Sequence, residues 1–506
     1  MFDPSAIVSW FKKTFSLKDR RLLLIIILLY LITRLVNLEK FPIFTDEGIY
    51  IHWAKIAWHD ATWRFISLTD GKQPLQTWVT IPFLKLFPTH PLLAGRLFSV
   101  SSGLVALVGI FSLLFYLFGK RAAIFGSLFY IFTPYFLFYD RMALVDSAVN
   151  AGFIWIFFFS ILMARTLRLD TALVSGIISG ISLLAKSSTE MFVGLSVFAP
   201  VLFWQKNNRE FKKKTIAYII LYLISFTLAL IIYNVQRLSP FLHFVAEKNK
   251  TFVLTLGEFI RNPFAVVFGN LPIIPADVAW ESGFILPFLG LLGLFFLFKK
   301  HQKLALYILL WILLPYLAIV FFAKVIFPRY LIFFASIFLI LAVFYLDSLK
   351  NKKTIKLLLV LYFVAALYFD YTIVFAQDSI PFPPIDRGQY IEGISAGTGV
   401  KEIIDFARQK SSEKPVILIA EGNFGVVGDM LEATTQQGDQ ITIKGYWPLE
   451  KENLLENQKE LKTHNVYIVY SHRNDFPQDL PLKFIQRFVK PGGQSSFYLF
   501  ELTSAP

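Results

Sequence analysis

The chain contains no cysteine among its 506 residues, so disulfide bonds and thiolate chemistry are excluded. Histidine is also scarce, and the 7 histidines form no cluster with metal-ligand spacing. The sequence shows no convincing internal repeat and no low-complexity linker. Charged residues make up only 17% of the chain, against 56% hydrophobic residues. This balance is unusual for a soluble domain of the same size.

Long apolar runs are what the sequence has in abundance. The mean hydropathy is +0.58, and runs of about 17–25 mostly apolar residues, the length that a membrane-spanning helix requires, recur along most of the chain. No small-residue cleavage site follows the first run, so we interpret it as a retained span and not as a signal peptide. The sequence predicts an α-helical polytopic membrane protein with about 11 transmembrane helices, at residues 22–38, 92–117, 122–139, 147–166, 171–186, 189–204, 215–236, 282–298, 304–322, 331–348 and 357–375.

Basic residues are concentrated in the short loops on one side of the predicted spans. The net charge is +14, and segments such as "FKKTFSLKDRR", "KNNREFKKK" and "LKNKKTIK" alternate with less basic loops. This is the pattern of cytoplasmic loops in a membrane protein, so it does not indicate a nucleic-acid partner. We expect a plasma (inner) membrane protein with a cytoplasmic N-terminus. The first long loop (39–91), a middle loop (237–281) and the C-terminal tail then face outward.

The composition changes at about residue 376. Short β-branched and aromatic segments at 416–420, 440–443, 466–470 and 497–502 are typical of strands, and a helical pattern at 399–410 precedes them. The sequence predicts a transmembrane domain over 1–375 and a small extracytoplasmic α/β domain over 376–506.

Two adjacent acids, Asp46 and Glu47, follow the first predicted span in the segment "FPIFTDEGIYIHWAKIAWHD". Helical spacing puts Ile49, Trp53 and Ile56 on one face and His52, Lys55 and His59 on another. We expect an interfacial helix on the outer leaflet, with the histidines also at the interface. One interpretation of the acids is that they stabilise the positive end of this helix dipole.

Several cations lie at the predicted outer ends of the spans, against the charge bias of membrane insertion. They occur with acids and an aromatic residue in the segments "DGKQPLQTW", "YDRMALVD", "AKSST" and "AKVIFPRY", which contribute Lys72, Arg141, Asp146, Lys186, Lys324, Arg329 and Tyr330. Cations beside a carboxylate suit a lipid-linked phosphate next to a general base. The alternative is that each cation extends separately to the outer lipid headgroups.

The order of these segments resembles the GT-C membrane glycosyltransferases, in the branch of protein O-mannosyltransferases and lipid A aminoarabinose transferases. The matching features are, in chain order, Asp46-Glu47, "KQPLQTW", Arg96, Arg141 with Asp146, "GISLLAKSS" and Arg329-Tyr330. The chain departs from the family pattern at Gln73 and Gln76, where the family has a proline and an aromatic residue.

The resemblance implies an inverting transferase that moves a hexosyl or pentosyl group from a polyprenyl-phosphate donor to an acceptor hydroxyl on a lipid, glycan or protein outside the membrane. Asp46 would be the general base, and Glu47 or Asp146 would orient it or a cation. The cations Lys72, Arg141 and Arg329, with Lys186 and Tyr330, would bind the donor phosphate. Some members use a divalent cation, and carboxylates here could hold Mg²⁺ or Mn²⁺.

Two other classes of function are compatible with parts of the sequence. A flippase or transporter of polyprenyl-linked lipids suits many spans with intramembrane charges, but it predicts two similar halves, which we do not find. A hydrolase is suggested by the G-x-S-x-G pattern at "GISAG", with Ser395. That motif requires a preceding strand, and a glycine-rich start to the helix at 399–410 explains it better. The turn "EGNFG" (421–425) could face an anion, but it is more simply a βα turn.

Overall fold

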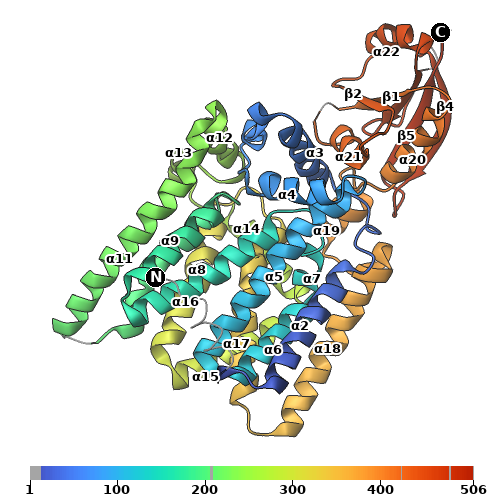
Figure 1. Ribbon diagram of the computed structural model, residues 1–506. Helices are drawn as coiled ribbons and strands as arrows, with labels where there is room; N and C mark the ends of the chain where they lie inside the picture. The colour runs from blue at the N-terminus through green and yellow to red at the C-terminus, as the bar shows by residue number, and fades with distance from the viewer. Residues whose placement is uncertain (1–12, 206–208, 423, 478–479, 505–506) are drawn as a thin grey trace.

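A computed structural model describes residues 13–205, 209–422, 424–477 and 480–504 (Figure 1). Parts of two predicted basic loops (1–12 and 206–208) lie outside the described residues. The chain forms a large helical domain with a small sheet domain at one end, next to helix α3 (Figure 1).

The helical domain follows the chain order of the predicted spans. Its helices are α2 (Leu17–Leu35), α3 (Thr45–His59), α4 (Leu75–Leu86), α5 (Pro91–Phe118), α6 (Lys120–Phe132), α7 (Pro134–Tyr139), α8 (Asp146–Thr166), α9 (Leu169–Leu183), α10 (Thr189–Leu195), α11 (Arg209–Tyr233), α12 (His243–Phe252), α13 (Leu256–Arg261), α14 (Val267–Glu281), α15 (Ile285–Lys300), α16 (Gln302–Phe322), α17 (Ile332–Ser348), α18 (Lys352–Phe375) and α19 (Pro384–Arg387). Short 3₁₀ turns lie between them, including η2 (Ile66–Asp70), η3 (Ser196–Phe203) and η6 (Pro328–Leu331).

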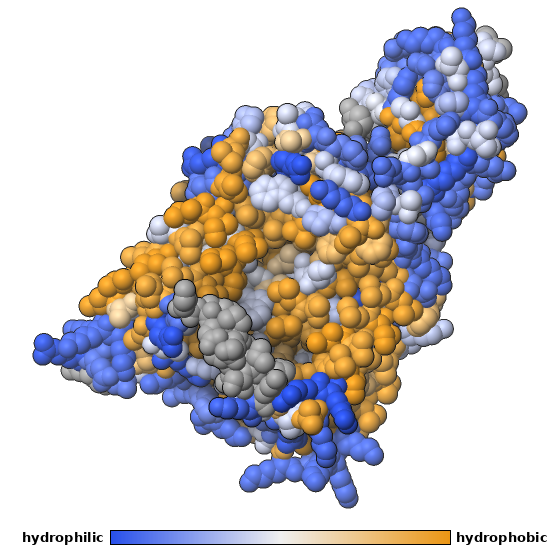
Figure 2. All heavy atoms as spheres, in the orientation of Figure 1, coloured by the Kyte–Doolittle hydropathy of each residue, from blue (hydrophilic) through white to orange (hydrophobic). Residues whose placement is uncertain are grey.

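The apolar helices are those of an integral membrane protein. Within the described residues, six helices are long and apolar enough to cross a membrane, and the pair α14–α15, bent by 109°, would make a seventh. Each predicted span coincides with helical structure, α9 and α10 being shorter apolar helices. Figure 2 shows a broad hydrophobic band on this domain between hydrophilic ends.

One prediction about the helices was wrong in detail. The predicted third span (122–139) is divided into α6 and α7, because Pro134 has no N–H to continue the ladder of helical hydrogen bonds and begins a new helix. The segment predicted to connect two spans (237–281) contains α12, α13 and α14.

The sheet domain has five strands in the order β2-β1-β3-β5-β4. Their bounds are β1 (Val416–Glu421), β2 (Ile441–Tyr446), β3 (Asn465–Tyr470), β4 (Leu482–Val489) and β5 (Ser496–Leu502), accompanied by helices α20 (Val400–Ser411), α21 (Gly428–Thr434) and α22 (Lys451–Asn457). β1 pairs in parallel with β2 and β3, whereas β5 is antiparallel to β3 and β4. All four predicted strands are present. β4 was not predicted, because a register shift between Phe484 and Gln486 interrupts its alternation.

The loops of the helical domain are divided between its two ends. The basic turns α5–α6, α15–α16 and α17–α18 lie at the end away from the sheet domain (Figure 1). Helices α3 and α4, from the first long loop, lie at the end that adjoins it (Figure 1). The structure therefore separates the basic loops from the segments that carry the predicted site residues.

Candidate functional site

Asp46 lies between two cations from distant parts of the chain. Its Oδ1 is 3.3 Å from Nζ of Lys72, and its Oδ2 is 3.0 Å from Nη2 of Arg329. The Asp46 side chain is 23% exposed, against 9% for Arg329, so the carboxylate is accessible while the guanidinium is almost enclosed. Nη1 of Arg329 is buried and has no hydrogen-bond partner among the described residues.

The local structure fixes each member of this triad. Asp46 is in the first turn of α3. Lys72 follows the left-handed Gly71 at the end of η2, and its Nζ also lies 3.5 Å from Oδ2 of Asp70. Arg329 is in η6, directly after Pro328, which supplies a fixed φ at the start of that turn.

The two cations control the charge of Asp46. Burial alone would raise the pKa of the Asp46 carboxyl, but Lys72 and Arg329 hold that pKa well below its usual range. Burial would likewise lower the pKa of Lys72, and Asp46 together with Tyr50 and Asp70 raises it above its usual range. The site is therefore built for an ionised carboxylate and a protonated amine.

A second acid–cation pair lies next to the triad. Oδ1 of Asp146 is 3.0 Å from Nζ of Lys186, and this ammonium is 3.9 Å from the ring centre of Tyr330. Burial raises the pKa of Tyr50. The positive charge of Lys72 lowers this pKa, and the negative charges of Asp46 and Asp146 raise it further. The structure thus brings together six of the predicted site residues: Asp46, Lys72, Asp146, Lys186, Arg329 and Tyr330.

Glu47 has a different environment from its neighbour Asp46. Its carboxylate is fully buried and forms two 2.8 Å hydrogen bonds with Nε and Nη2 of Arg96. It also accepts the N–H groups of Phe44 at 3.0 Å and Ala143 at 2.6 Å. Glu47 and Arg96 therefore tie the start of α3 to α5 and to the turn before α8, and they do not face the triad.

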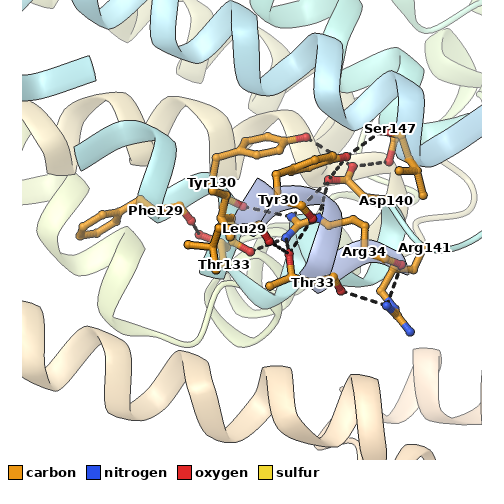
Figure 3. A network of polar contacts seen from close by, with 12 residues as sticks. Leu29, Tyr30, Thr33, Arg34, Phe129, Tyr130, Thr133, Asp140, Arg141 and Ser147 are labelled. Atoms are coloured by element: carbon orange, nitrogen blue, oxygen red, sulfur yellow. Dashed lines mark hydrogen bonds and ion pairs between the residues drawn. The ribbon is translucent and has the colours of Figure 1, made fainter. Parts of the chain in front are cut away.

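Arg141 is also separate from the triad. It donates to the carbonyl oxygens of Thr33, Arg34 and Asn37 at 2.8–3.0 Å, where α2 ends. Figure 3 shows the network beside it, in which the buried Asp140 is 3.2 Å from Nη2 of Arg34 and accepts from Ser147 at 2.8 Å. This network fixes the turn that leads to Asp146.

The prediction that the aromatic side chains of α3 lie at the lipid headgroups was wrong for Trp53. Trp53 is only 4% exposed, because protein covers this helix on both faces. The opposite face contacts the sheet domain: Nδ1 of His52 is 2.5 Å from Oδ1 of Asp429, and Nζ of Lys55 donates to the carbonyl oxygen of Glu432 at 2.6 Å. The α3 face that carries His52 and Lys55 is an interface between domains.

The segment around Ser395 has a structural role. The carbonyl oxygen of Ser395 accepts both the N–H and the hydroxyl of Thr45, at 3.1 and 3.0 Å, and Phe44 pairs with Ala396 in an isolated bridge. As the sequence predicted, the residues just before this serine do not form a strand, since 384–392 are helical, and a helix (α20) begins after Gly399.

The acids at the site are not arranged as ligands for a divalent cation. Among the described residues, no group of three or more His, Asp or Glu side chains could hold a metal ion. Asp46 and Asp146 are paired with three cations, whose charges would repel Mg²⁺ or Mn²⁺. We therefore assign no step to a metal.

Sequence reasoning missed several supporting residues. Asp70 joins Lys72 to Lys248, whose Nζ is 2.7 Å from its Oδ1. Asp429 holds α3 from a distant domain. Asp140 stands directly before Arg141 in "YDRMALVD", so its position was a visible signal. Lys248 lies 178 positions from Asp70, and His52 lies 377 positions from Asp429, so these two pairs have no signal in the sequence.

Residues 71–233 match the family model described as dolichyl-phosphate-mannose-protein mannosyltransferase. Across 96% of this chain and 98% of the other, the fold is similar to a crystal structure of ArnT from Cupriavidus metallidurans bound to undecaprenyl phosphate, with a TM-score of 0.65 and 14% sequence identity. An oligosaccharyltransferase, AglB from Archaeoglobus fulgidus in complex with an inhibitory peptide and a dolichol-phosphate, is similar with a TM-score of 0.54 and 13% identity, over 91% of this chain and 70% of that one. No curated protein matches by sequence. The predicted resemblance to GT-C membrane glycosyltransferases is confirmed by the family match and the shared fold.

Proposed function

We propose that this GT-C protein transfers a hexosyl or pentosyl group from a polyprenyl-phosphate donor to a hydroxyl of an acceptor on the outer side of the plasma membrane, with inversion at the anomeric carbon. The observation that carries the proposal is the position of Asp46 between Lys72 and Arg329, at the end of the helical domain next to the sheet domain. The match of residues 71–233 to a mannosyltransferase family model favours a transferase over a flippase.

The triad provides the two functions that an inverting transfer needs. Asp46 accepts the proton of the acceptor hydroxyl as its oxygen bonds to the anomeric carbon. The bond from that carbon to the phosphate oxygen breaks, and the phosphate leaves as an anion that Lys72 and Arg329 stabilise. Nη1 of Arg329, which has no partner among the described residues, is available to the phosphate.

Donor binding and base strength are connected in this arrangement. Before the donor binds, Lys72 and Arg329 make Asp46 a weak base. A phosphate that pairs with the same two cations neutralises their charge, so the pKa of Asp46 rises toward its usual value. The carboxylate becomes a better proton acceptor when the leaving group is in place.

The other site residues support this centre. Asp146 with Lys186 and Tyr330 lies beside the triad and extends the donor phosphate site. Glu47 is a positioning residue, since it holds the first turn of α3 through Arg96. Arg141 positions the turn that leads to Asp146 from the end of α2.

Substitution of the proposed base tests the function. We expect Asp46→Asn to bind a polyprenyl-phosphate donor but to lose at least ~10²-fold in turnover, because an amide cannot accept the proton. The assay is transfer of radiolabelled sugar by purified protein to membranes of cells that lack the gene. Asp60→Asn, a change at an exposed acid at the end of α3, is the matched control. Full activity of Asp46→Asn would overturn the assignment.

A further inference from the structure

The carboxyl ends of three parallel strands meet at one edge of the sheet domain. β1 lies between β2 and β3, so the chain passes from β1 to one neighbour and then crosses to the other side. The order of strands therefore reverses at the end of β1. In open α/β sheets, ligands bind outside the carboxyl ends of the strands at such a reversal.

A buried carboxylate organises this edge. Glu421, the last residue of β1, is 2% exposed and accepts the N–H groups of Ser471 at 2.9 Å and His472 at 2.7 Å. It also accepts from Nε of Arg473 at 3.0 Å. Burial would raise the pKa of Glu421, but the hydrogen bonds from His472, Ser471 and Arg473 lower it to about 2. The carboxylate thus fixes the segment after β3.

An exposed aromatic ring lies over the same edge. Trp447, directly after β2, is 60% exposed, and its ring centre is 4.8 Å from that of His472. Nδ1 of His472 pairs with the hydroxyl of Ser471 at 2.7 Å, and Arg473 uses Nη2 for the carbonyl oxygen of Leu449 at 3.2 Å. Nε2 of His472 and Nη1 of Arg473 have no hydrogen-bond partner in the part of the chain that the structure describes.

We propose that this edge, formed by Trp447, His472, Arg473 and Glu421, binds a sugar ring of a glycan acceptor. The exposed indole offers an apolar face for stacking, and His472 and Arg473 offer polar groups for hydroxyls beside it. Glu421 neutralises the charge of Arg473, so these two residues together carry no net charge. A phosphate group would instead favour a site with net positive charge. The chemistry fits a neutral, polyhydroxylated ring.

The edge is connected to the candidate active site by one turn of the chain. The segment from Glu421 to α21 carries Phe424, whose ring stacks on Trp53 of α3 with centres 6.1 Å apart. The Trp53 ring centre is in turn 5.6 Å from Nζ of Lys72, which pairs with Asp46. These contacts join the edge to the helix that carries Asp46. This assignment of the ligand as an acceptor rests on the proposed function.

The first test measures binding without turnover. The full chain labelled with 5-fluorotryptophan, in lipid nanodiscs, is titrated with water-soluble glycans released from the cell envelope, and the ¹⁹F resonance of Trp447 is identified by its loss in Trp447→Phe. We expect the glycans to shift this resonance and inorganic phosphate to leave it unchanged. A shift with phosphate alone, or no shift with glycans, would overturn the proposal. His472→Ala should weaken the glycan-induced shift, and it should raise the acceptor KM in the transfer assay, which is the test if Trp447 variants fail to fold.

The second test uses the transfer assay. We expect Trp447→Ala to raise the KM for acceptor glycan roughly tenfold, with kcat and the KM for donor unchanged, and Trp447→Phe to restore most of the affinity. Phe484→Ala, at an exposed aromatic residue on β4, is the matched control and should have the parental KM. An unchanged acceptor KM in Trp447→Ala would contradict the proposal. Failure of the proposed function would instead appear as full transfer by Asp46→Asn, whatever the ¹⁹F result.

Discussion

Nδ1 of His52 lies 2.5 Å from Oδ1 of Asp429 and joins the helix that carries Asp46 to the sheet domain. Oδ2 of Asp429 accepts the N–H of Gly425 at 2.6 Å, so the same carboxylate also fixes the turn before α21. The backbones of α3 and α21 approach closely at Gly48 of α3, where an added Cβ would lie 2.9 Å from N and Cα of Met430 in α21. The sheet domain therefore holds the helix that carries Asp46 in position.

This contact predicts the effect of a single methyl group. We expect Gly48→Ala to separate α3 from α21 and to lower both turnover and the unfolding midpoint, at a cost of about 1–3 kcal/mol from overpacking. Gly194→Ala is the matched control, since an added Cβ there meets no atom within 4 Å. Thermal unfolding in detergent and hydrogen exchange at α3 are the measurements. Parental values in Gly48→Ala would show that the sheet domain does not position α3.

The pH dependence of transfer should differ between the free and the donor-bound enzyme. Asp46 must be ionised to accept a proton, so the rate falls as the pH falls through its pKa. In the free enzyme, Lys72 and Arg329 hold that pKa well below 3.8. Because kcat/KM reports the free enzyme and kcat reports the donor-bound enzyme, kcat/KM should remain constant down to a lower pH than kcat does. Profiles from about pH 3 to 7 test this. In Lys72→Met the acid limb of kcat/KM should move to higher pH, and an unchanged limb would contradict the proposed control of Asp46.

The cations should be required for donor binding. We expect Lys72→Ala and Arg329→Lys each to weaken binding of a polyprenyl-phosphate sugar about tenfold or more, because charge-assisted bonds to phosphate are strong and lysine cannot reproduce the planar guanidinium. Lys324→Ala is the control, since Lys324 pairs with the exposed Glu258 at 2.8 Å. Donor affinity is measured by displacement of a fluorescent polyprenyl phosphate. Parental donor affinity in both variants, with normal folding, would show that Lys72 and Arg329 do not bind the donor phosphate and would favour contacts with lipid headgroups instead.

The sequence predicted the helical segments, because each is a long apolar run, and four of the five strands, because each is β-branched or aromatic. It also selected Lys72 and Arg329, because positive charge at the outer ends of spans is unusual, and Asp46, because an acidic pair follows the first span. It could not separate Asp46 from Glu47, because adjacent residues on a helix point in directions about 100° apart. Asp46 reaches the two cations, whereas Glu47 is buried against Arg96.

The environment of α3 could not be predicted from its own residues. An amphipathic segment with Trp53 on one face and His52 on the other is compatible with a membrane interface. In the structure, α4 and the sheet domain cover it instead, and the carboxylate that meets His52 is at Asp429, 377 positions further along the chain. Periodicity identifies the faces of a helix, but it does not identify what packs on them.

The orientation of the molecule in the membrane is the last prediction. The basic turn between α15 and α16 and the sheet domain lie at opposite ends of the helical domain (Figure 1), and the charge rule places the basic end in the cytoplasm. Because the chain has no cysteine, single cysteines can be introduced without background labelling. We expect Glu452→Cys in α22 to react with an impermeant maleimide in intact cells, and Lys303→Cys at the start of α16 to react only after permeabilisation. Both positions are exposed, and both elements lie away from α3 (Figure 1), so both variants should retain parental turnover. The reverse labelling pattern would put Asp46 and its cations on the cytoplasmic side and contradict an acceptor outside the membrane.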